Sequence, residues 1–212
     1  MIDFTYDNYL TTITLNRPDK ANALTPDMLK DLYDAVHKAR GSRAVIITGV
    51  GKVFSAGADL DFIDKGIASD PMWEELSRAI AELPGLTVCA LNGTLAGGAF
   101  GMALACDIRI AVPDARFFYP VVKMGVLPQP SDPARMCALI GPSRSKMILM
   151  AGQKIDCQTA QNWGLIDNMT TPGGLMDHAH SLVAGALTTP LTRLSTIKSL
   201  IGTATGVVLP DR

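Results

Sequence analysis

The protein has 212 residues, with 19 Lys and Arg against 20 Asp and Glu and a formal net charge of −1. This balance lacks the basic surplus of a protein that binds a phosphate backbone, so nucleic acid is not an expected partner. Hydrophobic residues make up 48% of the chain and charged residues 18%, which supplies a packed core, excludes global disorder and fits a single main domain.

The first elements along the chain are predicted to be a strand pair and an amphipathic helix. Residues 4–15 alternate in polarity around an Asp7-Asn8 turn signal, which is typical of a hairpin. A turn follows at residues 16–20. Thr25 is a favourable N-cap with Pro26 at the first helical position, and apolar residues recur at helical spacing from there until Gly41.

Short apolar runs then alternate with helical segments. Residues 44–49 form an apolar run ended by glycine, the pattern of a strand buried on both faces of a parallel sheet. Similar strands are predicted at residues 86–91 and 107–112, with helices at residues 73–83, 97–106, 143–151 and 159–163. This alternation indicates an α/β fold with helices covering a largely buried sheet.

Cysteine usage and hydropathy bear on the compartment. The four cysteines are scattered without a C-x-x-C pair, at Cys89, Cys106, Cys137 and Cys157. They favour buried thiols in a reducing compartment, so we expect a cytoplasmic protein. No signal peptide is visible, and the longest apolar stretch, residues 87–111, is broken by Asn92, several glycines and Asp107, so it indicates protein interior and not a membrane span.

Several common catalytic motifs are absent from the sequence. Gly51-Lys52-Val53 lacks the hydroxyl residue of a Walker phosphate loop, and the glycines from Gly93 to Gly101 do not follow the G-x-G-x-x-G spacing. No H-E-x-x-H motif and no G-x-S-x-G elbow is present. We therefore expect no metal site, and surface positions for the three histidines, His37, His178 and His180.

Two segments rich in small residues are the strongest functional signal. Residues 54–60, F-S-A-G-A-D-L, follow a buried strand and would let a ligand approach backbone N–H groups. Residues 92–107, N-G-T-L-A-G-G-A-F-G-M-A-L-A-C-D, place a glycine pair where a loop enters a helix. Together the segments are able to form a two-donor oxyanion hole. The alternative is that the glycines only permit close packing of helix and sheet.

These two segments resemble the crotonase family, the enoyl-CoA hydratases and isomerases. Further agreement comes from Leu15-Asn16-Arg17-Pro18 with Asn22-Ala23-Leu24, the region of Pro120 and Met124-Gly125, and Ala160 to Ile166. The resemblance spans nearly all of the chain. It implies a spiral of ββα units, assembly into trimers or dimers of trimers, and an acyl-CoA thioester as substrate in fatty acid metabolism, with no tightly bound cofactor.

The resemblance also implies which residues form the site. The thioester oxygen would lie between the backbone N–H groups of Ala58 and Gly98, which would stabilise an enolate or oxyanion. The path of CoA and substrate would be lined by residues at matching positions, namely Ala21, Ala23, Ala56, Asp59, Leu60, Leu95, Gly97, Pro120 and Val121.

The chain departs from the family at its acid–base positions. The two glutamates of a hydratase of this family fall on Gly101 and Val121, and neither residue moves a proton. The aspartate of the aroyl-CoA dehalogenases and the tyrosine of methylmalonyl-CoA decarboxylase fall on Gln129 and Pro128. We therefore expect decarboxylation, isomerisation or thioester hydrolysis and not the usual hydration, or alternatively a catalytically silent protein that binds CoA esters or acts as a scaffold.

Other polar residues near the expected pocket are predicted to lie on solvated loops or at a pocket rim, although each is a candidate acid or base. They are Tyr119, Lys123, Gln129, Ser131 and Asp132, with Asp61, Asp64 and Lys65 on the loop after Ala58. Glu74 and Glu75 are expected to face solvent. We divide the chain into a spiral core at residues 1–190 and a short helical tail at residues 191–212, where relatives continue into longer lid helices.

Overall fold

Two sheets organise the fold in a computed structural model that describes residues 1–205. The larger sheet has six strands in the order β1 (Ile2–Asp7), β2 (Leu10–Leu15), β3 (Ala44–Gly49), β5 (Leu86–Leu91), β7 (Ile108–Ala111) and β10 (Asn168–Met169). The smaller sheet has four strands in the order β4 (Val53–Ser55), β6 (Thr94–Ala96), β8 (Arg116–Phe118) and β9 (Ile155–Asp156).

From β3 to β8, consecutive strands alternate between the two sheets. The chain passes from β3 to β4, from β5 to β6 and from β7 to β8, each time leaving the larger sheet for the smaller one. Equivalent strands of successive turns are parallel neighbours, β3 beside β5 and β5 beside β7, and likewise β4 beside β6 and β6 beside β8. This repeated strand–strand–helix step is the predicted spiral of ββα units, which is confirmed.

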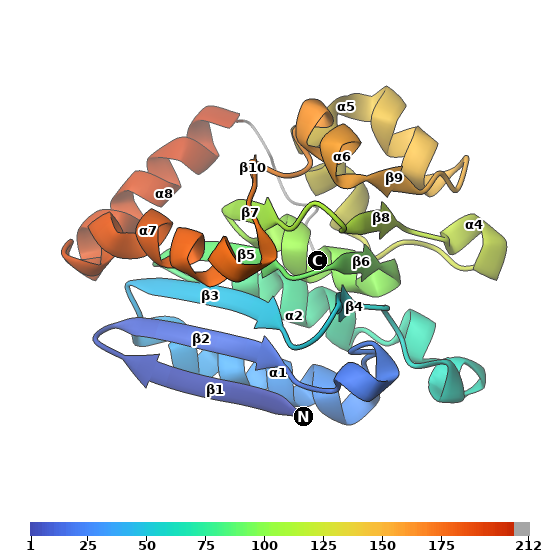
Figure 1. Cartoon of the computed structure of the whole chain (residues 1–212), viewed down its shortest axis with the longest axis horizontal. Coiled ribbons are helices and arrows are strands. Elements are labelled where there is room, and N and C mark those ends of the chain that lie inside the picture. The colour runs from blue at the N-terminus through green and yellow to red at the C-terminus, as the bar shows by residue number, and fades with distance from the viewer. Residues whose placement is uncertain (206–212) are drawn as a thin grey trace.

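Helices cover both faces of the larger sheet (Figure 1). The helix α7 (Leu175–Leu187) lies in front of the sheet and contacts β3, β5 and β7, whereas α1 (Pro26–Lys38) lies behind it. Behind the sheet α1 packs on α2 (Met72–Ala81), and α2 packs on the short helix α3 (Phe100–Ala105). The remaining helices are α4 (Val121–Met124), α5 (Asp132–Leu149), α6 (Cys157–Trp163) and α8 (Leu191–Thr205).

The strand pair and the first helix are confirmed. Asn8 and Tyr9 form the turn with positive φ, and β2 buries Thr11, Ile13 and Leu15 on one face. The Thr25 side chain accepts a hydrogen bond from the Met28 N–H, as expected of the N-cap. The predicted strands β3, β5 and β7 and the helix α2 are also present.

Several elements were not predicted. The strands β4, β6, β8, β9 and β10 are two or three residues long, too short to display a period in the sequence. The helix predicted from Ser143 is the second half of α5, whose first half was missed, and α5 kinks at Gly141, where φ is 78°. The predicted tail is helical from Leu191 to Thr205, and its residues 206–212 lie outside the described part of the chain.

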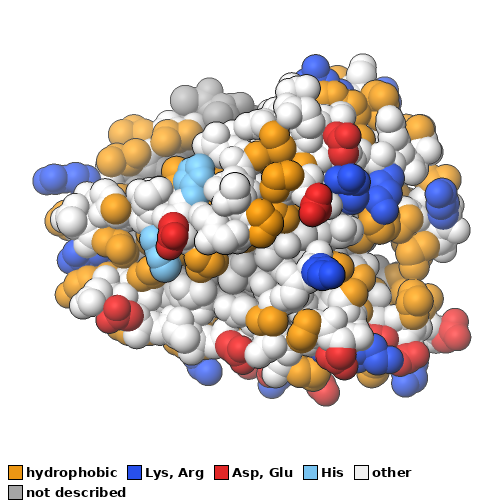
Figure 2. All heavy atoms as spheres, in the orientation of Figure 1, with side chains coloured by type: hydrophobic (Ala, Val, Ile, Leu, Met, Phe, Trp, Pro, Cys, Tyr) orange, Lys and Arg blue, Asp and Glu red, His pale blue; other side chains and the backbone are white. Residues whose placement is uncertain are grey.

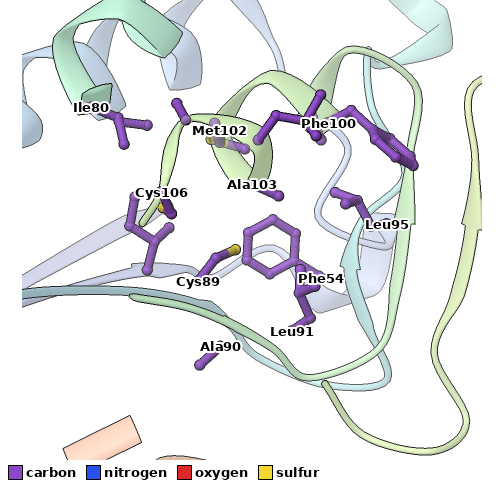
Figure 3. Close-up of a cluster of buried hydrophobic side chains, with 14 of the residues drawn as sticks. Phe54, Ile80, Cys89, Ala90, Leu91, Leu95, Phe100, Met102, Ala103 and Cys106 are labelled. Atoms are coloured by element: carbon purple, nitrogen blue, oxygen red, sulfur yellow. The ribbon is translucent and has the colours of Figure 1, made fainter. Parts of the chain in front are cut away.

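The core beneath α3 anchors the first of the two glycine-rich segments. Figure 3 shows the Phe54 ring between side chains of α3 and those of β5, beside Cys89, Leu91 and Ala103. Phe54 is fully buried and is the last large side chain before the small residues that follow it. Its burial fixes the point at which this loop leaves β4.

The histidines, the potential metal ligands and the cysteines are placed as follows. Figure 2 shows histidine side chains at the surface over α7, and residues 1–205 contain no group of three potential metal ligands. No helix in this part of the chain is long and apolar enough to cross a membrane. The prediction of buried thiols holds for Cys89, Cys106 and Cys157 but is wrong for Cys137, which is exposed because it lies on the outer face of α5.

Candidate active site

A cavity of about 180 Å³ lies where the two glycine-rich segments meet the region around α4. Its lining is mostly apolar. The side chains and backbone that form it belong to Ala56, Ala58, Leu60, Ile63, Ala68, Trp73, Gly97, Gly98, Tyr119, Pro120, Val121, Met124, Val126, Leu127 and Gln129. Leu60 and Leu127 are exposed by 78% and 85%, so apolar side chains also flank it toward solvent.

The backbone around Ala58 leaves the N–H of this residue outside its own strand pairing. Leu24 pairs with Ala58 in a parallel bridge, in which the Leu24 N–H donates to the Gly57 carbonyl and the Asp59 N–H donates to the Leu24 carbonyl. In such a bridge the central residue directs its own N–H and C=O away from its partner. Ala58 lines the cavity, so its N–H is a candidate donor to a ligand there.

Gly98 is the second backbone donor beside the cavity. It belongs to the 3-10 turn Gly97–Ala99 that leads into α3, and N–H groups in a first helical turn lack an acceptor within the helix. The Trp73 ring covers this glycine so closely that an added Cβ would lie 3.1 Å from the indole carbons. Trp73 is itself fixed by a 2.8 Å hydrogen bond from Nε1 to the Ile67 carbonyl.

Two glycines bring these donors together. Gly57 and Gly97 both have positive φ, 89° and 56°, in the left-handed region that favours glycine. A Cβ on Gly57 would lie 2.9 Å from the Ala96 carbonyl oxygen. The functional interpretation and the close-packing interpretation of the glycines are therefore compatible, because the close approach is what places Ala58 beside Gly98.

A polar network holds the first segment from behind. The Asp59 carboxylate accepts a 2.5 Å bond from Arg17 Nη1 and a bond from the Asp61 N–H, and these contacts hold its pKa below the usual value. Ser55 Oγ donates to the Asn22 carbonyl and accepts from the Gly57 N–H. The segment is thus fixed by side chains from residues 17–22 as well as by strand pairing.

Most of the expected site residues lie at the cavity. Those that line it are Ala56, Ala58, Leu60, Gly97, Gly98, Pro120 and Val121. Four others are outside the lining, namely Ala21, Ala23, Asp59 and Leu95. Leu95 is part of the buried core, and Asp59 uses its carboxylate for Arg17 and the Asp61 N–H.

Four of the polar residues near the pocket do not lie on solvated loops, although two of them, Tyr119 and Gln129, do line the cavity. Tyr119, Gln129, Ser131 and Asp132 are all buried, and Asp132 is not exposed at all. The physical reason is that α5 begins at Asp132 and packs against α3, which encloses its first turn. Lys123, Asp61, Asp64 and Lys65 are exposed as expected.

Glu74 also departs from its predicted position. Its side chain is only 14% exposed and accepts hydrogen bonds from the N–H and hydroxyl of Ser131, at 3.1 and 2.9 Å. It also forms an ion pair with Arg78 at 3.7 Å. Glu75, the neighbouring residue, is exposed. Glu74 therefore links α2 to the start of α5 and does not face solvent.

Sequence reasoning missed the residues that position the cavity. Arg17 and Asn22 were noted only as part of a resemblance, yet Asn22 is fully buried and donates to the carbonyls of Val50 and Val53. For Trp73 the sequence predicts only a place at the start of the helix over residues 73–83. A signal was available for Asn22, since a polar residue between apolar ones in a turn commonly bonds the backbone.

The enoyl-CoA hydratase/isomerase family matches residues 5–210, nearly the whole chain. The chain belongs to this family. Among curated proteins, YngF of Bacillus subtilis is 34% identical over 191 residues, which cover 85% of this chain and 74% of that protein. The 1,2-epoxyphenylacetyl-CoA isomerase of Escherichia coli is 29% identical over 205 residues, covering 91% of this chain and 78% of the isomerase.

Solved structures share the fold of this enoyl-CoA hydratase/isomerase family member. The enoyl-CoA hydratase of Bacillus anthracis superposes with a TM-score of 0.89 at 27% identity, covering 98% of this chain and 84% of the hydratase. Pseudomonas aeruginosa PA4980 gives a TM-score of 0.87 at 25% identity, covering 97% of this chain and 92% of that one. The resemblance found in the sequence, and the crotonase fold that it implied, are confirmed.

Proposed function

We propose that this protein is an enzyme that binds an acyl-CoA thioester, with the thioester oxygen between the N–H groups of Ala58 and Gly98. The observation that supports this most is the pair of backbone donors beside one apolar cavity, held together by the contact between Gly57 and Gly97. Two preorganised donors stabilise an oxygen that gains negative charge, and each is typically worth about 3 kcal/mol of barrier.

The reaction that we propose is not the usual hydration. Val121 lines the cavity and Gly101 faces Asp132 and Ser77, so neither family glutamate position offers a carboxyl group. Decarboxylation, isomerisation and thioester hydrolysis all use an enolate or oxyanion on the thioester oxygen, and the apolar lining favours an apolar acyl group. The 1,2-epoxyphenylacetyl-CoA isomerase of E. coli is an example of an isomerase among the relatives.

A thermal-shift comparison of acetoacetyl-CoA with free CoA tests the proposal. Only the thioester has an oxygen for both donors, so it should raise the unfolding midpoint more than free CoA at equal concentration. Equal shifts would contradict the oxyanion hole and favour a silent protein. Incubation with a panel of acyl-CoA esters, analysed by mass spectrometry, separates an enzyme from a silent protein, because only an enzyme converts an ester to a product.

Two variants of Gly98 separate the donor from the space around it. Gly98→Pro removes the N–H, whereas Gly98→Ala keeps the N–H and adds only the Cβ that meets Trp73. We expect the proline variant to lose the thioester-specific shift and about 100-fold in turnover, with a smaller loss in the alanine variant. Equal effects of both variants would mean that packing on Trp73, and not the donor, is responsible.

We also propose that the chain assembles into a trimer or a dimer of trimers. Its exposed apolar side chains support an interface, including Ile197, Leu200 and Ile201 on α8. Large apolar side chains on one helix are a common mark of a subunit contact. Light scattering coupled to size-exclusion chromatography measures the mass directly, and a monomeric mass would contradict this.

A further inference from the structure

Asp132 is a buried carboxyl group with one oxygen unused. Its side chain is not exposed to solvent, and its Oδ2 accepts a 3.0 Å hydrogen bond from the Tyr119 hydroxyl. Its Oδ1 has no hydrogen-bond partner among the described residues. A buried carboxyl oxygen without a partner is costly to fold, so its presence asks for a functional reason.

This carboxyl group lies close to the proposed oxyanion donors. A Cβ built on Gly101 would be 3.2 Å from Asp132 Oδ1, so the carboxyl group packs directly on this glycine. Gly101 follows Gly98 by three residues, which is one helical turn along the same face. Asp132 therefore packs on α3 one turn beyond Gly98, and its hydrogen bond from Tyr119 joins it to a residue that lines the cavity.

Tyr119 connects the cavity to Asp132. It lines the cavity, and its ring stacks on Phe100 at 5.3 Å between centroids, which fixes its position. Its hydroxyl donates to Asp132 and accepts from the Gln129 N–H at 3.4 Å. A phenol oxygen has two lone pairs, so one lone pair remains for a proton or a donor from a substrate.

The charged groups around Asp132 come from two helices. Arg135 lies one turn along α5, and its guanidinium donates to Ser77 Oγ while its Nη2 has no partner among the described residues. Glu74 on α2 bonds Ser131 and pairs with Arg78. Burial and the Glu74 carboxylate raise the pKa of Asp132 to about 7, against the opposing effects of Tyr119 and Arg135. Such a group exchanges protons near neutral pH.

We propose that Tyr119 and Asp132 are the acid–base pair of this cavity, with Tyr119 as the catalytic residue that meets the substrate and Asp132 as the positioning residue that takes up the proton. This inference rests on the proposed function, since it needs a thioester bound at Ala58 and Gly98. It supplies the proton transfer that Gly101 and Val121 do not provide.

The step balances without any other reactant. The Tyr119 oxygen takes a proton from Cα of a 3-enoyl-CoA while the Tyr119 hydroxyl proton passes to Asp132 Oδ2. The C–H electron pair forms the dienolate, whose negative charge rests on the thioester oxygen between Ala58 and Gly98. The proton then returns from Asp132 through Tyr119 to Cγ, which gives the 2-enoyl-CoA. No net proton or electron is gained or lost.

Deuterium incorporation tests this pair. The protein is incubated with 3-butenoyl-CoA in D₂O, and mass spectrometry follows deuterium at carbon and conversion to the 2-enoyl isomer across pH 5 to 9. We expect the wild-type rate to rise with pH and level off near 7. Asp132→Asn and Tyr119→Phe should each lower the rate about 100-fold or more, and Asp132→Glu should restore part of it. Glu75→Gln, an exposed carboxylate on α2, is the matched control and should leave the rate unchanged.

Binding of acetoacetyl-CoA distinguishes the two proposals. If the thioester-specific thermal shift is present in the wild type and in both variants, the oxyanion hole is intact and any loss of exchange belongs to the pair. The inference is overturned if the wild type shows no exchange despite this shift, or if Asp132→Asn keeps the wild-type rate and pH profile. If the shift itself is absent in the wild type, the proposed function fails first.

Discussion

Gly57 and Gly97 face each other so closely that a Cβ built on Gly57 would lie 3.2 Å from the Cα of Gly97. This contact joins two loops that are about forty residues apart in the sequence, each at the end of a short strand of the smaller sheet. Because Ala58 and Gly98 are the next residues in the two loops, the separation of the two proposed donors depends on this contact.

Substitution of Gly57 should therefore affect both stability and thioester binding. Gly57→Ala places a methyl group 2.9 Å from the Ala96 carbonyl oxygen in a left-handed conformation, and we expect a cost of about 2 kcal/mol or more. Gly66→Ala is the control, because Gly66 has a similar φ of 85° but nothing near its Cβ position. Chemical unfolding measures the free energy of unfolding of both variants. If Gly57→Ala costs no more than Gly66→Ala, the contact between the loops is unimportant.

The Arg17–Asp59 pair should make stability sensitive to acid. Arg17 holds the pKa of Asp59 below its usual value, so this stabilisation is present above the ordinary carboxyl pKa near 4 and is lost as the pH falls through the depressed one. We expect Asp59→Asn to cost about 1 to 3 kcal/mol at pH 7 and to differ less from the wild type in acid.

Asp61→Asn is the matched control for this prediction, since Asp61 is an exposed carboxylate two residues away. Urea unfolding at pH 7 and at pH 3 gives the comparison. A constant difference between wild type and Asp59→Asn over this range would contradict the assigned ion pair. Asp59→Asn should also weaken the thioester-specific shift, because Arg17 holds the loop of Ala58.

Asp132 should change the pH dependence of stability in the direction opposite to Asp59. Its pKa is raised to about 7, so the folded protein keeps the proton that the unfolded chain releases above about pH 4. Stability then falls as the pH rises from about 4 to 7 and levels off above 7. Asp132→Asn removes this penalty and should be more stable than the wild type at pH 8, by about 1 kcal/mol or more.

Thermal unfolding of the wild type and of Asp132→Asn at pH 5 and pH 8 shows which of the two proteins is more stable at each pH. The advantage of Asp132→Asn should be larger at pH 8, where the wild-type carboxyl group is ionised in both states. If the charge of Asp132 instead stabilised the fold, Asp132→Asn would be less stable than the wild type at pH 8. If Asp132→Asn gains stability and loses proton exchange, Asp132 is a residue at which activity is gained at the expense of stability.

The fold was predictable from the sequence where elements are long and periodic. The alternation in β2 and the Thr25-Pro26 helix start are properties of neighbouring residues, and the structure has both. The two- and three-residue strands were not predictable in this way, because β4, β6 and β8 form through pairing with neighbours that lie far away in the sequence. They follow from the three-dimensional spiral and not from local preference.

Of the candidate site, the sequence predicted the segments that contribute backbone N–H groups but not the burial of the polar side chains. The small residues around Ala58 and Gly98 are visible in the sequence because glycine has a distinct conformational range. For Tyr119 and Asp132 the sequence predicts a solvated loop or a pocket rim, because polar side chains mostly lie at the surface. Their burial depends on the packing of α5 against α3, a contact between residues far apart in the chain.

Gly101 offers a direct way to move the Asp132 carboxyl group without altering its charge. In Gly101→Ala the new methyl group would lie 3.2 Å from Asp132 Oδ1 and 3.5 Å from the Ser77 side chain, so the carboxyl group has to shift by a few tenths of an ångström. We expect proton exchange to fall by about tenfold, because misplacement of a reacting group by about 1 Å costs about 100-fold. Thioester binding should be unchanged, since the Gly98 N–H is untouched.

Gly185→Ala in α7 is the control for the substitution itself. It replaces another helical glycine with nothing within 4 Å of the new Cβ, so it should only stabilise the helix, by up to about 1 kcal/mol. Exchange of 3-butenoyl-CoA in D₂O and the acetoacetyl-CoA thermal shift are measured on both variants. A Gly101→Ala protein that exchanges at the wild-type rate would argue against proton transfer at Asp132, whereas one that loses thioester binding would place Gly101 in the binding site itself.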